Sequence, residues 1–223
     1  MMNYKGVIFD FNGTLVRDSQ FHDEAWRRMA VKLRGCTLSD DEMTESVHGW
    51  TNRSAIEYLL GRPVDSRELS SLSDEKESIY IDLCKDDPSF AFAPGAESFL
   101  SHLSDEKIPM AIATSAGKGN VDFYIRYFGL RRWFRDGTII FDDGSFPGKP
   151  DPEIYRRAAR SISLHPSACV VIEDAASGIL AAERAGVGKI IAVGFHLSAS
   201  APRMFISDFR ELDSTTLLDC LAY

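Results

Sequence analysis

The stretch VIFDFNGTL (7–15) joins a short apolar run to an aspartate and then to a turn. The apolar residues before Asp10 are typical of a buried strand in a parallel sheet. The Asn-Gly pair at 12–13 permits the unusual backbone angles of a tight turn. We therefore predict that Asp10 lies at the carboxyl end of a strand, the place where open α/β sheets bind ligands.

Similar short apolar runs recur along the chain, and turn formers or charges bound each of them. The runs are KGVIF (5–9), MAIAT (110–114), ACVVI (168–172) and KIIAV (189–193), with TIIF (138–141) as a weaker fifth candidate. Helical patterns such as 95–107 and 150–163 alternate with them from residue 94 onward. This alternation predicts an α/β fold built on a Rossmann-like open parallel sheet.

Residues 16–85 break the alternation, because they carry helical spacing with no strand between the helices. The segment 85–96 contains Pro88, Pro94 and Gly95 and is typical of an irregular return crossing. We therefore expect an α/β core domain formed by 1–15 and 86–223. An all-α cap domain, 16–85, is expected to be inserted after the first strand.

Composition narrows the classes of function. The 223 residues carry a net charge of −8, which disfavours binding to nucleic acid or to an anionic membrane, since both need clustered Lys and Arg. No apolar run approaches the ~20 residues of a membrane span. The cysteines Cys36, Cys84, Cys169 and Cys220 form no CxxC pair and suggest no disulfide framework. A cytoplasmic protein is expected, as a monomer rather than an oligomer.

Acidic and hydroxyl side chains follow three of the predicted strands. They are Asp10, Thr114 with Ser115, and Glu173 with Asp174. Each has an ordinary explanation in isolation, since Asp10 suits a turn and Asp174 suits a helix N-cap. Lys149 could be a surface residue, although Gly148 and Pro150 suggest a turn that fixes its backbone.

Together these residues form a coherent phosphate site. The Asp10 carboxylate can attack phosphorus and form an aspartyl-phosphate. Because carboxylate and phosphate are both anionic, a cation is needed, and Mg²⁺ suits carboxylates and phosphate oxygens. Asp10 and Asp174 are predicted to hold it, with Glu173 as a further ligand. Lys149 is predicted to act as a point charge, and Thr114 to donate a hydrogen bond to the phosphate.

Four segments then resemble the motifs of the haloacid dehalogenase superfamily: DFNGT (10–14), AIATS (111–115), GKPDPEIY (148–155) and EDAASGILAAERAG (173–186). The resemblance is closest to the branch with a helical cap, which includes β-phosphoglucomutase and phosphoglycolate phosphatase. FHDEAW (21–26) resembles the opening of that cap. The resemblance implies a Rossmann-like core, a mobile cap and Mg²⁺-dependent phosphoryl transfer through Asp10.

Asn12 departs from the family pattern, which normally has a general acid/base aspartate at this position. An amide cannot exchange a proton at neutral pH, and loss of such help typically costs ~10²–10⁴ in rate. The resemblance still assigns the backbone carbonyl of Asn12 to the metal. A cap residue is an alternative proton source, and His22 is the nearest candidate, although a solvent-facing helix residue is the more common explanation.

The cap stretch VHGWTNRS (47–54) matches the segment that relatives use to select substrates. Its expected substrate-binding residues are His48, Trp50, Asn52 and Arg53, together with Ser115 of the core. Trp50 could instead pack against neighbouring residues, and Arg53 could be a surface charge. A mutase that handles bisphosphates needs a second phosphate-binding site, and Arg53 is the one fixed positive charge in this stretch.

Three functions remain open. The first is a Mg²⁺-dependent phosphohydrolase that acts on a small phosphorylated metabolite resembling a sugar phosphate. The second is a β-phosphoglucomutase-like mutase. The third is a catalytically weak protein that binds a phosphorylated metabolite, because Asn12 lacks acid/base capacity. The sequence favours the phosphohydrolase, with slow turnover of alkyl phosphates and better turnover of activated ones.

Overall fold

The computed structural model describes residues 4–48, 50–194 and 204–212. Cys220, counted above among the thiols, lies outside the described residues. The chain forms two compact units, one made of 1–17 with 91–223 and the other of 18–90. Each unit is described by itself below, as the core unit and the cap unit.

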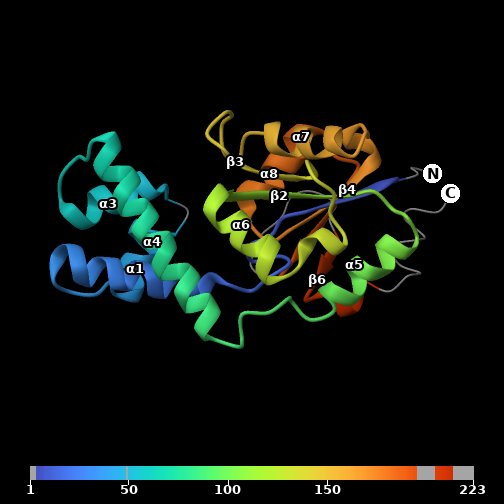
Figure 1. Ribbon diagram of the computed structural model, residues 1–223. Coiled ribbons are helices and arrows are strands. Elements are labelled where there is room, and N and C mark those ends of the chain that lie inside the picture. Colours follow the sequence, from blue (N-terminus) through green and yellow to red (C-terminus); the bar gives the residue numbers. More distant parts are fainter. Residues whose placement is uncertain (1–3, 49, 195–203, 213–223) are drawn as a thin grey trace. The chain divides into compact units, whose positions relative to one another are not determined.

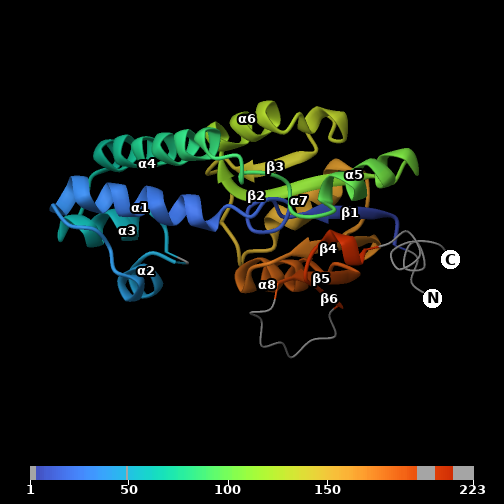
Figure 2. The same ribbon diagram turned by 90° about the horizontal axis from the view of Figure 1, so that it is seen from below.

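The core unit is built on a six-stranded sheet in the order β3-β2-β1-β4-β5-β6, in which every neighbouring pair is parallel. The strands are β1 (Gly6–Phe9), β2 (Met110–Gly117), β3 (Ile139–Asp142), β4 (Cys169–Glu173), β5 (Lys189–Val193) and β6 (Met204–Ile206). Figures 1 and 2 show β1 in the middle of this sheet, between β2 and β4. The predicted α/β fold with an open parallel sheet is confirmed.

Helices cover both faces of the sheet (Figure 1). Successive strand residues point to opposite faces. Ile8 belongs to an apolar cluster with residues of α7 (Glu153–Ser161) and α8 (Ala176–Ala185). Phe9 contacts the ring of Phe99 on α5 (Ala96–Asp105), on the other face. Helix α6 (Lys118–Tyr127) contacts β2 and β3. Burial on both faces explains why the strands read as continuous apolar runs.

The predicted strands lie within a few residues of the observed ones, and 189–193 coincides with β5. Strand β2 is the main difference, because it continues past Thr114 to Gly117, where it pairs with Asp142 after an irregularity. Strand β6 was not predicted. It lies at the edge of the sheet, and its apolar run of three residues, of which only Ile206 is buried, is too short to indicate a strand.

The described residues of the cap unit (18–48 and 50–90) form four helices: α1 (Ser19–Arg34), α2 (Asp40–Ser46), α3 (Asn52–Leu60) and α4 (Ser66–Asp86). Its core is a single apolar cluster that includes Trp26, Met29 and Ile56. Local signals fix the helix starts: Ser39 and Glu42 form a capping box, and the Asp65 carboxylate accepts two backbone N–H groups at the start of α4. No described helix is both long enough and apolar enough to span a membrane.

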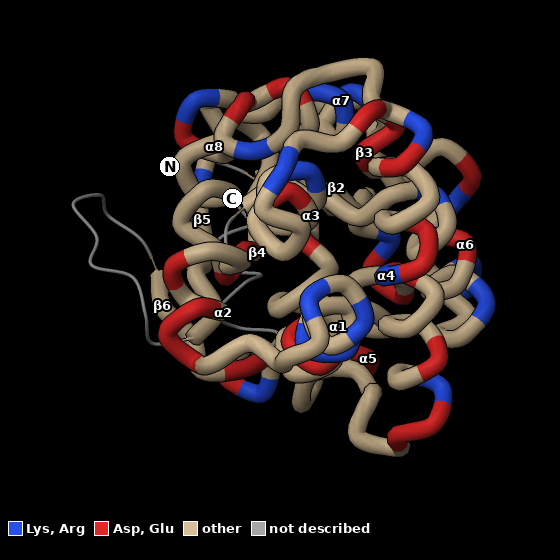
Figure 3. Tube along the Cα trace, turned by 90° about the vertical axis from the view of Figure 1, so that its left-hand side faces the viewer, with Lys and Arg blue, Asp and Glu red and all other residues tan. Residues whose placement is uncertain are grey.

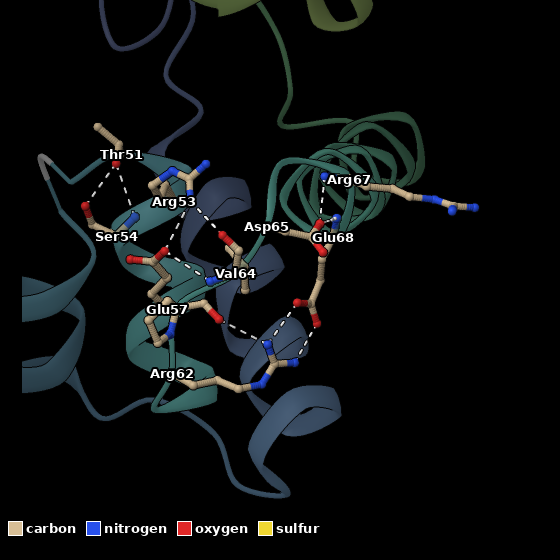
Figure 4. A network of polar contacts seen from close by, with 10 residues as sticks. Thr51, Arg53, Ser54, Glu57, Arg62, Val64, Asp65, Arg67 and Glu68 are labelled. Atoms are coloured by element: carbon tan, nitrogen blue, oxygen red, sulfur yellow. Dashed lines mark hydrogen bonds and ion pairs between the residues drawn. The ribbon is translucent and has the colours of Figure 1, made fainter.

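Arg53 and Glu57 tie the loop after α3 to that helix (Figure 4). Arg53 Nη1 donates to the Val64 carbonyl at 2.9 Å and pairs with Glu57 at 3.2 Å, while Glu57 also accepts from the Val64 N–H. Arg62 makes a bidentate pair with Glu68 in the same loop region. These contacts satisfy backbone groups between α3 and α4.

The two chain crossings between the units pair with each other within the core unit. Val16 forms an antiparallel bridge with Phe92, and the Ala93 N–H donates to the Leu15 carbonyl at 2.8 Å. Val16 also donates to the Phe11 carbonyl and accepts from the Gly13 N–H. The turn that follows Asp10 is therefore joined directly to both crossings.

Candidate active site

The candidate site lies at the carboxyl ends of β1, β2 and β4. Asp10 follows β1, Thr114 lies in β2, and Glu173 is the last residue of β4. The chain runs from β1 outward to β2 and β3 and then returns to the other side of β1 as β4. Such a topological switch point is where open α/β sheets bind ligands. Sheet topology thus gathers residues that are more than 160 positions apart in sequence.

Lys149 joins two of the carboxylates. Its Nζ lies 2.6 Å from Asp10 Oδ1 and 2.8 Å from Glu173 Oε1. The three side chains are almost fully buried, with exposed fractions of 6%, 8% and 1% for Lys149, Asp10 and Glu173. Charge-assisted hydrogen bonds in such a setting are short and strong. The ammonium is therefore a fixed point charge beside the predicted nucleophile.

Glu173 is held at both carboxylate oxygens. Oε1 accepts the Tyr155 hydroxyl at 3.1 Å in addition to Lys149, and Oε2 accepts the backbone N–H groups of Asp174 and Ala175 at 2.6 and 2.8 Å. The side chain lies against Gly178 of α8, where an added Cβ would be 1.5 Å from Oε1. These contacts fix the Glu173 carboxylate, which in turn positions the Lys149 ammonium.

Asp174 contacts the turn after β1. The Thr14 hydroxyl donates to its Oδ1 at 3.0 Å. A Cβ at Gly13 would lie 2.1 Å from Asp174 Oδ2, and the φ of Gly13 is +83°, so glycine is required there on both counts. Asp174 is not the N-cap of α8, because Ala175 occupies that position. The carboxylate is thus directed to the β1 turn instead of capping the helix.

Burial, together with the charges of neighbouring groups, shifts the pKa values of this cluster. Burial, and then the charge of Asp10, raise the pKa of Asp174 to about 8. Burial raises the pKa of Asp10 to about 7, although Lys149 opposes the shift. Burial alone would lower the pKa of Lys149, but Asp10 and Glu173 raise it well above its usual value. Burial also opposes ionisation of Glu173, yet Lys149 and the backbone donors hold its pKa below the usual value.

Asn12 connects β2 to α6. Its Oδ1 accepts the Thr114 hydroxyl at 3.1 Å, and its Nδ2 donates to the Tyr124 hydroxyl at 2.9 Å. Thr114 Oγ1 also accepts the Ala116 N–H. The Tyr124 ring stacks on Phe11 with centroids 4.5 Å apart. Both ends of the Asn12 amide are therefore engaged within the core unit.

The carboxylates could hold a divalent cation. One ligand oxygen from each of Asp10, Glu173 and Asp174 lies within 4.8 Å of the other two. A set of hard oxygen donors with surplus negative charge fits Mg²⁺. Because both oxygens of Glu173 already accept hydrogen bonds, Asp10 and Asp174 are the better placed donors.

The remaining predicted core residue, Ser115, follows Thr114 and is exposed. Sequence reasoning did not single out Thr14, Tyr124, Tyr155 or Gly178, although all contact the cluster or Asn12. Thr14 and Tyr155 lie inside the quoted motifs DFNGT and GKPDPEIY, so their hydroxyls were a usable signal. Tyr124 had no local signal, because 112 positions separate it from Asn12.

His22 lies in a polar network inside the cap unit. Its Nδ1 is 2.9 Å from Lys76 Nζ, its Nε2 is 3.5 Å from the buried Asp18, and its ring stacks on Tyr80 at 3.9 Å. An ammonium can only donate, so Nδ1 accepts and the ring proton lies on Nε2, facing Asp18. His22 is therefore engaged within the cap unit, and the alternative of a purely solvent-facing residue is wrong.

The four substrate-binding residues predicted in the cap stretch 47–54 also have partners within the cap unit. His48 Nε2 lies 2.9 Å from Asp23, and Asn52 Nδ2 lies 3.5 Å from Glu77. Trp50 is 48% exposed, and its ring meets Tyr58 edge to face. Arg53 holds the loop after α3, as described above. These positions lie in one short segment of the cap unit but not in one hydrogen-bonded cluster.

Charge on the described surface is mixed. Figure 3 shows Lys and Arg interspersed with Asp and Glu along the tube. Many exposed cations are paired with a neighbouring acid, such as Lys118 with Asp122 and Arg132 with Glu97. The described residues present no extended basic tract of the kind that phosphate backbones require.

Comparison with known proteins agrees with this geometry. The model of the haloacid dehalogenase-like hydrolases matches residues 4–186. Hexitol phosphatase A of Escherichia coli (strain K12) is 30% identical over 91% of this chain and 88% of that protein. β-Phosphoglucomutase of Bacillus subtilis (strain 168) is 28% identical over 82% and 80%.

Among solved structures, a HAD hydrolase, family IA, variant 3 from Entamoeba histolytica HM-1:IMSS has a TM-score of 0.90 at 32% identity. That alignment covers 98% of this chain and all of that one. The sequence relatives are named as a phosphatase and a β-phosphoglucomutase, and the solved structure shares the fold of this chain. This chain belongs to the haloacid dehalogenase-like hydrolase family and is an enzyme of the phosphatase type.

Proposed function

We propose that this protein is a Mg²⁺-dependent phosphohydrolase that acts on a small phosphorylated metabolite through an aspartyl-phosphate on Asp10. The observation that carries the proposal is the Asp10–Lys149–Glu173 cluster at the carboxyl ends of β1 and β4. The names of the phosphatase relatives support sugar phosphates as the first substrates to test.

The cluster provides what phosphoryl transfer requires. The Asp10 carboxylate attacks phosphorus, and the Lys149 ammonium stabilises the negative charge on the phosphoryl oxygens. Thr114 donates its hydroxyl to a phosphoryl oxygen once its hydrogen bond to Asn12 is exchanged. Glu173 and Tyr155 keep Lys149 in place.

Asp10, Asp174 and the backbone carbonyl of Asn12 would hold Mg²⁺, with Glu173 as an outer ligand. The bound ion would screen the phosphate from the carboxylates. The fit rests on the three converging carboxylates and is supported by the raised pKa of Asp174, which burial and then the charge of Asp10 cause.

A mutase function has less support. A bisphosphate needs a second cationic side chain for its second phosphate, and Arg53 of α3 already donates to the Val64 carbonyl and pairs with Glu57. The third candidate is a weak binder of a phosphorylated metabolite, and Asn12 favours it, because the amide supplies no proton.

The test is release of phosphate from a panel of phosphate esters by the wild type and by Asp10→Asn, with Mg²⁺ or with a chelator. We expect turnover in the wild type with Mg²⁺ and loss of at least ~10³-fold in Asp10→Asn, because the nucleophile is removed. Full activity of Asp10→Asn would overturn the aspartyl-phosphate. Saturable binding of an ester without turnover would favour the binder.

A further inference from the structure

The leaving group of a phosphate ester departs with both electrons of the broken P–O bond. An alkoxide is a poor leaving group unless a side chain protonates it, and such help is typically worth ~10²–10⁴ in rate. The identity of the groups around Asp10 therefore restricts which esters this core can cleave.

Asn12 supplies no such proton. Its amide does not exchange protons at neutral pH, and its N–H and carbonyl ends are turned to Tyr124 and Thr114 at 2.9 and 3.1 Å. The partner Tyr124 is only 1% exposed and lies stacked against Phe11. Asn12 is thus held as a structural link between β2 and α6 instead of as a donor to the substrate.

Asp174 would be ionised when it holds Mg²⁺, and the other proton-bearing groups of the cluster are committed to one another. Lys149 donates to Asp10 and Glu173, and the Tyr155 hydroxyl donates to Glu173. The Thr14 hydroxyl donates to Asp174. These hydrogen bonds hold the carboxylates in place, so breaking one to protonate a leaving group would disturb the nucleophile itself.

We propose that the substrate is an acyl phosphate, a mixed anhydride of phosphate with the carboxylate of a small metabolite. This inference rests on the proposed function. The leaving group of an acyl phosphate departs as a carboxylate, a stable anion that needs no proton.

The transfer balances without an acid. The P–O bond to the substrate carboxylate breaks, and a P–O bond to Asp10 forms. Because the aspartyl-phosphate is also an acyl phosphate, one bond replaces another of the same kind. Water then attacks phosphorus, the Asp10 carboxylate leaves with its electron pair, and the extra proton of the water passes to the phosphate product or to solvent.

The second step has no side-chain base at position 12. Water attack is therefore slower than phosphoryl transfer from an activated donor, and the phosphorylated Asp10 accumulates. This accumulation gives a readout that is independent of turnover, namely the mass of the Asp10 peptide after acid quenching.

The experiment compares acetyl phosphate, 4-nitrophenyl phosphate and glucose 6-phosphate as substrates of the wild type and of Asn12→Asp, with Mg²⁺. In the wild type we expect kcat/KM to be at least ~10²-fold higher for acetyl phosphate than for glucose 6-phosphate, the size of the missing acid assistance. Asn12→Asp should narrow this ratio at least tenfold, mainly by faster cleavage of glucose 6-phosphate. Phosphorylated Asp10 should accumulate in the wild type and less in Asn12→Asp.

Comparable kcat/KM for acetyl phosphate and glucose 6-phosphate in the wild type would overturn the inference, even if Asn12→Asp failed to fold. Selective loss of glucose 6-phosphate cleavage in Tyr124→Phe or His22→Gln would also overturn it, by identifying a proton donor. A different result would contradict the proposed function itself. In that case no donor, acetyl phosphate included, would release phosphate in a Mg²⁺-dependent way, and no phosphorylated Asp10 would form.

Discussion

Asp10 and Glu173, which end neighbouring parallel strands, share a single ammonium group. Lys149 Nζ lies 2.6 Å from one carboxylate and 2.8 Å from the other. Neither carboxylate is more than 8% exposed, so water offers little compensation for the loss of this cation. The same contact therefore serves both the stability of the core unit and the chemistry of Asp10.

Lys149→Met should lower kcat/KM by about 10²–10³-fold, because it removes the fixed positive charge from the phosphoryl group. It should also lower the melting temperature more at pH 8 than at pH 5.5, since the stranded carboxyl groups can take up protons at the lower pH. Steady-state kinetics and thermal unfolding at both pH values measure these effects. Lys118→Met is the control, because its ion pair with Asp122 is exposed and contributes little.

Gly178→Ala should destabilise the protein by about 1–3 kcal/mol, because the new Cβ would overlap the Glu173 carboxylate. Displacement of Glu173 also loosens Lys149, so activity should fall in parallel. Gly119→Ala on α6 is the matched control, since an added Cβ there meets nothing within 4 Å. Denaturant unfolding compares the two variants, and equal stability of both would contradict the packing argument.

Tyr155→Phe removes one hydrogen bond to Glu173 and should cost about 1 kcal/mol of unfolding free energy. Lys149 and two backbone N–H groups still hold Glu173, so the loss of activity should stay below tenfold. Chemical denaturation and kinetics measure both effects. A loss as large as that of Lys149→Met would show that the Tyr155 hydroxyl has a more direct role.

Mg²⁺ affinity should rise with pH between about 6 and 9. Without a metal, the pKa of Asp10 is raised to about 7 and that of Asp174 to about 8, and the cation binds the ionised carboxylates. Binding near pH 7 should therefore release protons. Titration calorimetry in buffers of different ionisation enthalpy measures the number released, and an affinity that is flat across this range would contradict the site.

The same pKa shifts determine whether the metal-free protein gains or loses stability as the pH rises. In the unfolded chain these carboxyls ionise near pH 3.8, whereas in the folded chain they stay protonated up to about pH 7–8. The folded state therefore binds more protons between these limits, and the two groups make stability fall as pH rises from about 4 to 8. Excess Mg²⁺ should reduce this fall, as thermal unfolding with and without the ion would show.

Much of the fold could be predicted because a strand that is buried on both faces of the sheet is apolar at successive positions. The runs that became β1, β4 and β5 are continuous and apolar for that reason. The edge strand β6 has only three residues, so its apolar run is too short to indicate a strand. The end of β2 was also missed, because its last three residues are small and mostly exposed.

The motif residues of the site could be predicted because sheet topology brings strand ends together. Their supporting contacts could not. Tyr124 lies on α6, 112 positions from its partner Asn12, and Gly178 matters only because the Glu173 side chain lies against it. Such requirements depend on side-chain directions in space, which strand periodicity does not specify.

The bridge between Val16 and Phe92 bears on how such an enzyme can change its substrates. Backbones paired in this way lie only about 5 Å apart, so the chain leaves the core unit and returns to it at almost the same place. Any segment whose ends lie equally close could occupy the position of 18–90 without moving a strand of the sheet. A single exchange of one continuous stretch of gene would thus replace the whole cap unit while Asp10, Lys149 and Glu173 kept their geometry.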